Sequence, residues 1–174
     1  MNEIKYQTGK VEITDWQKYK KIRLAALKND PQAFSSFYGA ECKLIDEEWQ
    51  ERVASGLCKK NKKIFIGVFD ETNNYVAIGG AFTREDAREW NVVAVYVAPE
   101  CRRRGIGKVL LSAIIAELKK IGGVEKLVLR VNRKQRPAVK LYKSFGFAIE
   151  ETIKDQIMGD GEFHDEYEMI KACY

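Results

Sequence analysis

Residues 91–110 read NVVAVYVAPECRRRGIGKVL, and the interpretation of the whole chain starts from this stretch. An apolar run at residues 92–98 is followed by a proline turn and then by a basic segment that contains Gly105 and Gly107 and opens an apolar, helix-periodic segment. A helix that follows a strand and a glycine-containing loop is a ready anion site, because its first N–H groups have no partner within the helix. Glycine lets an anion approach the backbone, and arginine offers forked donors to phosphate oxygens. The stretch therefore indicates a phosphate site, with a solvated basic turn as the plain alternative.

Apolar periodicity predicts strands and helices on both sides of this stretch. Alternating or continuous apolar runs predict strands at residues 2–13, 64–69, 75–82, 92–98, 126–131, 147–152 and 166–172. Helical spacing predicts helices at residues 16–29, from 46 to the pair Ser55-Gly56, 105–121 and 138–145. Thr14 and Gln17 fit a capping box for the first helix. The pair Gly79-Gly80 within a strand predicts a bulge or the close approach of another group.

Two sequence patterns resemble those of a known family. Arg102-x-x-Gly105-x-Gly107 after a strand resembles the acyl-CoA-binding motif of the GNAT superfamily of N-acetyltransferases. A strand that ends in Asn132 and is followed by Ala-x-x-Leu-Tyr-x-x-x-Gly-Phe, residues 138–147, is similar to the other wall of the acyl-CoA cleft in that family. Because both patterns occur in the expected order, the chain is identified as a member of this superfamily.

The resemblance implies the fold class and the domain organisation. We expect an α/β (α+β) fold with a mixed, mostly antiparallel, twisted seven-strand sheet, a central splayed pair of parallel strands, and helices on both faces. The strand–helix–strand unit at residues 92–131 fits a parallel crossover. At 174 residues, the chain is expected to be one N-acetyltransferase domain spanning residues 1–174.

The resemblance also implies which residues hold acetyl-CoA. Backbone groups of Val95–Val97 are expected to bind the pantetheine arm as an added pseudo-strand, and those of residues 103–108 the pyrophosphate. Asn132 is expected to bond the pantetheine with its amide. The implied cofactor-binding residues are Val95, Tyr96, Val97, Arg102, Arg103, Arg104, Gly105, Ile106, Gly107, Lys108, Asn132, Ala138 and Tyr142.

The chemistry of amine acetylation points to a general acid and a general base. Tyr142 is the expected acid, since a phenol can protonate the departing thiolate, although a tyrosine on an apolar helix face is commonly a core residue. Relatives often place a glutamate on the strand of the first motif, but residues 92–98 contain no carboxylate. Glu89 and Glu41 are substitute bases, each with a plain surface role as its alternative. Proximity with a water chain is a further alternative.

The sequence does not identify the acceptor amine. Phe34, Phe37, Tyr38 and Glu41 are expected to line a pocket for a small amine, a polyamine or a protein N-terminus. One rival interpretation is a catalytically silent acyl-CoA-binding module, which the missing strand carboxylate favours. Another treats residues 102–107 as a nucleotide or RNA phosphate site, but the stretch lacks a Walker ending and a stacking-aromatic pattern.

Composition excludes other classes. The net charge of +5 is modest, so we expect neither nucleic acid nor membrane as a partner. Four scattered cysteines and one histidine suggest no metal site and no disulfide framework, and Cys101 is either an inert thiol or one with a lowered pKa. The chain has no run of membrane-spanning length and no signal-peptide pattern, so a cytoplasmic protein is expected, with a homodimer possible.

Overall fold

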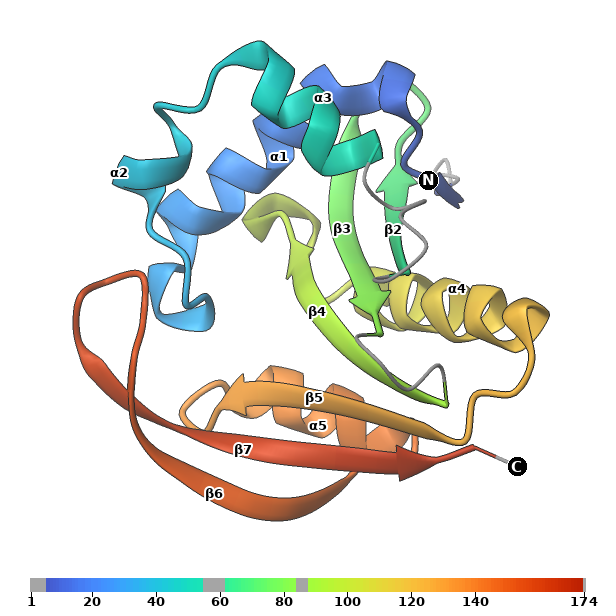
Figure 1. The fold of residues 1–174 in the computed structure, drawn as a ribbon, viewed down its shortest axis with the longest axis vertical. Coiled ribbons are helices and arrows are strands. Elements are labelled where there is room, and N and C mark those ends of the chain that lie inside the picture. Colours follow the sequence, from blue (N-terminus) through green and yellow to red (C-terminus); the bar gives the residue numbers. More distant parts are fainter. Residues whose placement is uncertain (1–5, 55–61, 84–87, 174) are drawn as a thin grey trace.

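A computed structural model describes residues 6–54, 62–83 and 88–173 (Figure 1). Its strands are β1 (Gln7–Lys10), β2 (Lys63–Phe69), β3 (Tyr75–Phe82), β4 (Glu89–Val97), β5 (Lys126–Asn132), β6 (Ala148–Ile157) and β7 (Phe163–Ala172). Its helices are α1 (Trp16–Asn29), α2 (Tyr38–Glu41), α3 (Asp46–Ala54), α4 (Ile106–Ile121) and α5 (Arg136–Ser144), with short 3-10 turns η1 (Ile13–Asp15), η2 (Pro31–Ala33) and η4 (Pro99–Cys101).

The seven strands form one sheet in the order β1-β2-β3-β4-β5-β7-β6. Every neighbouring pair is antiparallel except β4 and β5, which are parallel. The predicted mixed seven-strand sheet with one central parallel pair is therefore confirmed.

Helices cover the sheet from both sides. On one face, α4 buries Leu110 and Ile114 in a core that also contains Tyr142 of α5. On the other face, Tyr19 of α1 and Trp49 of α3 belong to a second core. These helices form where the sequence places apolar side chains at helical spacing, so each buries one stripe against the sheet. The prediction of helices on both faces is confirmed.

The parallel strands diverge after a short paired segment. Register partners join β4 to β5 only from Glu89 opposite Lys126 to Asn91 opposite Val128. Beyond these residues the two strands separate, as Figure 1 shows. At the divergence Ala94 has φ of 55°, and the register between β3 and β4 shifts between Ile78 and Gly80. A bulge of this kind bends a strand and increases its twist, which is how β4 turns away from β5.

The glycine pair in β3 has the predicted role. A Cβ on Gly80 would lie 2.4 Å from the carbonyl oxygen of Ile64, and one on Gly79 would lie 3.0 Å from the side chain of Ile114. The bulge and the close approach are both present at this pair.

Several predicted boundaries were wrong. The first strand comprises only Gln7–Lys10 of the predicted 2–13, whose first four residues lie outside the described part. Thr14 is not the cap of α1, because it lies inside η1, where the N–H of Glu12 is 3.4 Å from the Asp15 carboxylate. The expected end of α3 at Ser55-Gly56 also lies outside the described residues.

The later strands differ from the predicted ones in ways that matter for the site. Strand β4 begins at Glu89 rather than Val92, so a carboxylate does lie on this strand. Strands β6 and β7 each have ten residues and are longer than predicted. In the described part of the chain no helix is long and apolar enough to cross a membrane.

Candidate active site

The free edge of β4 faces the gap between β4 and β5. The N–H of Ala98 donates to the carbonyl of Val76 at 2.9 Å, so the backbone groups of Ala98 point to β3. Successive residues of a strand point their backbone groups to opposite sides, so those of Val97 and Val95 point to the gap and those of Tyr96 to β3. Of the three residues predicted for the pantetheine arm, Val95 and Val97 therefore direct backbone groups to the gap, but the carbonyl of Val97 already accepts a hydrogen bond from Arg102.

The basic loop ends in a backbone arrangement that exposes N–H groups. Gly105 is the N-cap of α4 with φ of 78°, and no other heavy atom lies within 4 Å of where its Cβ would be. The first N–H groups of α4, on Ile106 and Gly107, lack helical partners by their position. The N–H of Lys108 donates to Gly105 at 2.9 Å, so Lys108 does not belong to the predicted set of free donors.

The two sequence patterns meet in space at the start of α4. A Cβ on Gly107 would lie 3.1 Å from the side chain of Leu141 on α5 and 3.9 Å from that of Val97 on β4. A larger residue at this position would require the Leu141 side chain to shift by a few tenths of an ångström. The basic loop, the end of β4 and α5 thus lie close together at the start of α4.

Arg102 has a structural role instead of a free guanidinium. Its Nε donates to the carbonyl of Val97 at 2.9 Å, its terminal nitrogen forms an ion pair with Asp30, and it lies 5.7 Å from the ring centroid of Tyr96. The residue therefore fastens the end of β4 to the end of α1. Arg103 and Arg104 are exposed, as is Arg102.

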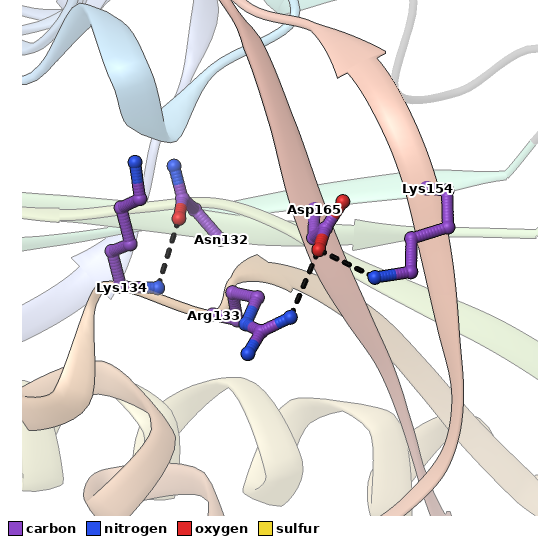
Figure 2. Close-up of polar contacts among 5 residues, drawn as sticks. All are labelled: Asn132, Arg133, Lys134, Lys154 and Asp165. Carbon is purple, nitrogen blue, oxygen red and sulfur yellow. Dashed lines mark hydrogen bonds and ion pairs between the residues drawn. The ribbon is translucent and has the colours of Figure 1, made fainter.

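Asn132 is only 2% exposed, and its amide is engaged within the protein. The side-chain NH2 group donates to the carbonyl of Gln32 at 3.1 Å, and the side-chain oxygen accepts from the N–H of Lys134 at 2.9 Å (Figure 2). The amide therefore holds η2 and the β5–α5 connection in place. A direct bond to pantetheine has to use its second N–H.

The basic cluster that follows Asn132 is partly neutralised. Figure 2 shows Arg133 and Lys154 converging on Asp165, at 2.9 and 2.8 Å. The hydrogen bond from Lys154 and that from Arg133 lower the pKa of Asp165. Lys134 and Arg136 line the adjacent hollow of about 680 Å³. This cluster is largely a local ion-pair network.

Tyr142 combines burial with a missing hydrogen-bond partner. Its side chain is buried in the core beneath the sheet, with the ring centroid 6.0 Å from that of Phe147. Burial raises the pKa of its hydroxyl, so the phenol stays protonated at neutral pH. No hydrogen bond within the described residues satisfies this hydroxyl. A protonated, unengaged phenol suits the predicted acid role.

A cleft of about 1020 Å³ opens above the gap. Its floor consists of residues 91–94 of β4 and 128–130 of β5, which are the residues at and just past the last paired position. One wall is the segment 33–36 and the end of β6, residues 156–157. The point where the strands separate is therefore open to a second substrate.

The predicted acceptor residues have different places. Phe34 lines the cleft, but Phe37 and Tyr38 do not line it and are 40% and 39% exposed. The aromatic pattern did not indicate which rings turn inward. Phe34 does so because its ring packs under the guanidinium of Arg23, 5.1 Å away.

Glu41 lines the cleft but has two arginine partners. Arg23 bonds both of its oxygens, at 3.1 and 2.9 Å, and Arg52 lies at 2.7 Å. Burial by itself raises the pKa of Glu41, but the hydrogen bonds and charges of the two arginines outweigh it, and the pKa is lowered. A carboxylate held this firmly is a poor proton acceptor, so the geometry argues against Glu41 as the base.

Glu89 lies at the paired end of β4. Its carboxylate forms an ion pair with Lys126 at 3.2 Å, and its side chain is 44% exposed. It lines the cleft, although it precedes the point where the strands separate.

Glu166 is a cleft residue that sequence reasoning missed. It lies on β7 opposite Asn132 and is 9% exposed. Burial raises the pKa of its carboxyl, and the charge of Arg130 offsets only part of this. No local sequence signal distinguishes it from the other acidic residues of β7.

The described residues include no group of three His, Cys, Asp or Glu side chains placed to hold a metal ion. Cys42, Cys101 and Cys173 are free thiols, and Cys58 lies outside the described residues. Burial raises the pKa of Cys101, so the alternative of a lowered thiol pKa was wrong.

The fold therefore combines a sheet with one splayed parallel pair, a helix N-terminus near the gap and a cleft above it. The chain matches the model of the Acetyltransferase (GNAT) family over residues 24–147. Because this match covers well over half of the chain, the chain belongs to that family. It is an N-acetyltransferase of the GNAT superfamily, and the family uses acetyl-CoA.

Individual proteins agree with this assignment. An N-alpha-acetyltransferase from Sulfurisphaera tokodaii is 35% identical over 75 residues, which are 43% of this chain and 44% of that protein. The L-amino acid N-acetyltransferase AaaT from Escherichia coli is 27% identical over 130 residues, 73% of this chain and 76% of that protein.

Solved structures share the fold. An acetyltransferase of the GNAT family from Streptococcus pneumoniae superposes with a TM-score of 0.82 at 21% identity, covering 97% of this chain and 100% of that one. The acetyltransferase yncA from Salmonella typhimurium, solved with acetyl-CoA, gives 0.79 at 16% identity, with 97% and 94% covered.

Proposed function

We propose that the protein transfers the acetyl group of acetyl-CoA to a primary amine by direct attack within a ternary complex. The observation that carries this proposal is that the gap between β4 and β5 opens directly into the cleft. A donor bound along the gap and an amine bound in the cleft would meet where the strands separate.

The chain's own groups fit acetyl-CoA. The edge groups of Val95 and the N–H of Val97, whose carbonyl is engaged by Arg102, suit the amides of an extended pantetheine arm. The open space at Gly105 and the N–H groups of Ile106 and Gly107 suit a pyrophosphate. When bound, acetyl-CoA supplies a thioester whose carbonyl carbon the amine attacks. Tyr142 then gives its proton to the leaving sulfur.

The charges in the cleft favour an acceptor that carries an acidic group beside its amine. Lys63 lines the cleft, its ammonium lies 5.6 Å from the ring centroid of Phe65, and no ion pair joins it to a described carboxylate. Burial and then the charge of Arg52 lower the pKa of Lys63, and the charge of Glu51 offsets only part of this, so the ammonium is incompletely compensated. A carboxylate on the acceptor would compensate the charge of the Lys63 ammonium. The names of both relatives, which refer to N-alpha and amino-acid acetylation, agree with an amino acid or a peptide N-terminus as acceptor.

The test measures thiol release from acetyl-CoA with a panel of amines. The panel contains free amino acids, the matching amino acid amides, short peptides with free N-termini, and polyamines. We expect turnover with amino acids or peptides, and slower turnover with each amide than with its acid. Faster turnover of polyamines would contradict this acceptor class.

A second measurement addresses the silent-module alternative. Calorimetric titration with acetyl-CoA reports cofactor binding without an acceptor. Binding without turnover of any amine in the panel would support a silent acyl-CoA-binding module and would refute the proposed function.

A further inference from the structure

Glu166 points into the cleft because of the alternation of β7. Its neighbours Tyr167 and Met169 belong to or pack against the core under α4 and α5. Successive residues of a strand face opposite sides of the sheet, so residues two positions apart, such as Tyr167 and Met169, share one side. Glu166 and Glu168 therefore lie on the opposite side, and both line the cleft.

Glu166 is the cleft carboxylate that lacks a cationic partner. Glu89 is paired with Lys126, and Glu168 with Arg130. Glu41 is held by two arginines. Among the described residues, by contrast, no hydrogen bond or ion pair reaches the carboxylate of Glu166, although its side chain is almost fully withdrawn from water. A carboxylate that is buried and only partly compensated, here by the charge of Arg130, is unfavourable for stability and is often found where it serves a function.

The groups around Glu166 explain why its charge is disfavoured. On β5 Glu166 faces the neutral amide of Asn132, and on β6 it faces Ile153. The guanidinium of Arg130 lowers the pKa of Glu166 but does not outweigh the effect of burial. The cleft wall opposite consists of residues 33–36, which carry no charge. Along β7 the flanking titratable groups are paired: His164 with Asp160, and Glu168 with Arg130.

We propose that Glu166 is the general base, which takes a proton from the acceptor ammonium in the cleft, directly or through one water. This inference rests on the proposed function. Glu166 takes one proton from the ammonium and later releases it to solvent. The free amine then forms a C–N bond with the acetyl carbon while the C–S bond breaks. After the attack nitrogen loses its second proton to solvent, and solvent returns one proton to the Tyr142 phenolate that donation to the sulfur has left, so the net reaction releases one proton.

The fold explains why a residue of β7 can take this role. Strand β4 carries a carboxylate only at its paired end, and Glu89 there is neutralised by Lys126. Strand β7 is the neighbour of β5 on the side away from β4, so its cleft-facing side chains lie one strand spacing from the floor of the gap. A base with a raised pKa is also closer to the pH at which the enzyme must exchange protons.

The experiment compares Glu166→Gln with Glu168→Gln, a matched change on the same strand and the same face. We expect Glu166→Gln to lower kcat/KM at neutral pH by roughly 100-fold, the lower end of the usual effect of a general base. The fall of kcat/KM on the acidic side of the wild-type pH profile should be absent in this variant. The difference in kcat/KM between variant and wild type should shrink above about pH 9, where more free amine is present in solution. Glu168→Gln should keep the acidic limb.

Two further measurements keep the result interpretable. Acetyl-CoA binding and the thermal midpoint of Glu166→Gln should match or exceed those of the wild type, because the substitution removes an unpaired buried charge. Glu166→Asp, which keeps the charge but shortens the reach, should retain the acidic limb at a reduced rate. If the wild type is active and Glu166→Gln has the same pH profile, Glu166 is not the general base, and the proposed function still stands. A wild type that turns over no amine overturns the proposed function itself.

Discussion

The backbone N–H of Gly159 donates a hydrogen bond of 2.6 Å to the carbonyl oxygen of Phe34. This bond joins the turn between β6 and β7 to the segment that forms one wall of the cleft, a contact between distant parts of the chain that can be followed in Figure 1. A Cβ on Gly159 would lie 2.4 Å from the carbonyl oxygen of Ser36 and 2.9 Å from that of Pro31. Glycine is therefore required for the cleft wall to close against the turn.

Gly159→Ala should displace this wall and weaken binding of the acceptor. We expect the KM for the amine to rise about tenfold, equivalent to roughly 1.4 kcal/mol, with acetyl-CoA affinity little changed. Steady-state kinetics and calorimetry measure the two effects. Gly161→Ala is the matched control, because Gly161 lies in the same turn at φ of 80° with no atom within 4 Å of the added Cβ. An equal rise in KM for both variants would show that strain in the turn, and not the contact with the wall, is responsible.

Gly105→Ala separates backbone strain from phosphate binding. The residue has φ of 78° and open space at its Cβ, and Gly123 has φ of 68° with the same open space. Each alanine should lower the free energy of unfolding by about 1 kcal/mol, the usual penalty for the left-handed conformation. Only Gly105→Ala should weaken acetyl-CoA binding, because only its methyl group would enter the proposed phosphate site. Equal affinities of the two variants for acetyl-CoA would remove Gly105 from that site.

Tyr142→Phe should lower kcat and leave the affinity for acetyl-CoA nearly intact. The phenol can act only as a proton donor at neutral pH, since burial raises its pKa above the ordinary tyrosine value. The loss should be on the order of 100-fold if proton donation to the sulfur is substantial. Because the wild-type phenol ionises only at high pH, the pH dependence of kcat below about pH 10 should have the same shape in Tyr142→Phe as in the wild type. Unchanged turnover of a good amine would show that Tyr142 serves only the core.

Glu41→Gln should reduce stability more than activity. The substitution leaves the guanidinium of Arg23 buried without its charge partner, and removing one member of a buried ion pair destabilises by about 3 kcal/mol. Urea unfolding at neutral pH measures this change, with the exposed Glu47→Gln as the control. A variant with wild-type stability and lost turnover would restore Glu41 as a catalytic candidate.

The same pair predicts a pH dependence of stability. The folded-state pKa of Glu41 lies below its unfolded value, so its contribution is present above the ordinary glutamate pKa of about 4.3 and is lost as the pH falls through the folded value. Glu166 has the opposite sign: its folded pKa is raised, so its contribution is lost as the pH rises. Urea midpoints of wild type and Glu41→Gln should therefore converge in acid.

Local patterns predicted the elements that depend on local backbone chemistry. The apolar periodicity of α4 and the glycines at its two ends were sufficient for its limits, because caps and turns act over a few residues. The Gly79-Gly80 bulge was predicted for the same reason. Predictions failed where a competing short-range structure intervened, as at Thr14, where η1 precedes α1.

The roles of individual side chains were much less predictable. Arg102 and Asn132 occur at the expected positions of their motifs, yet Asp30 and Gln32, from the other end of the chain, engage their polar groups. Phe37 and Tyr38 are as aromatic as Phe34 but turn away from the cleft. No spacing rule contains this information.

The sequence by itself determined the family, the order of the strands and helices, and the glycine positions at both ends of α4. Only the tertiary structure decided which carboxylate is free. Glu41, Glu89 and Glu168 each acquire a cation from another element, whereas β7 carries Glu166 into a buried position beside Asn132 without one. The reason is physical: a carboxylate's proton affinity depends on its burial and on charges brought near it by folding, and both come from residues far away in the chain.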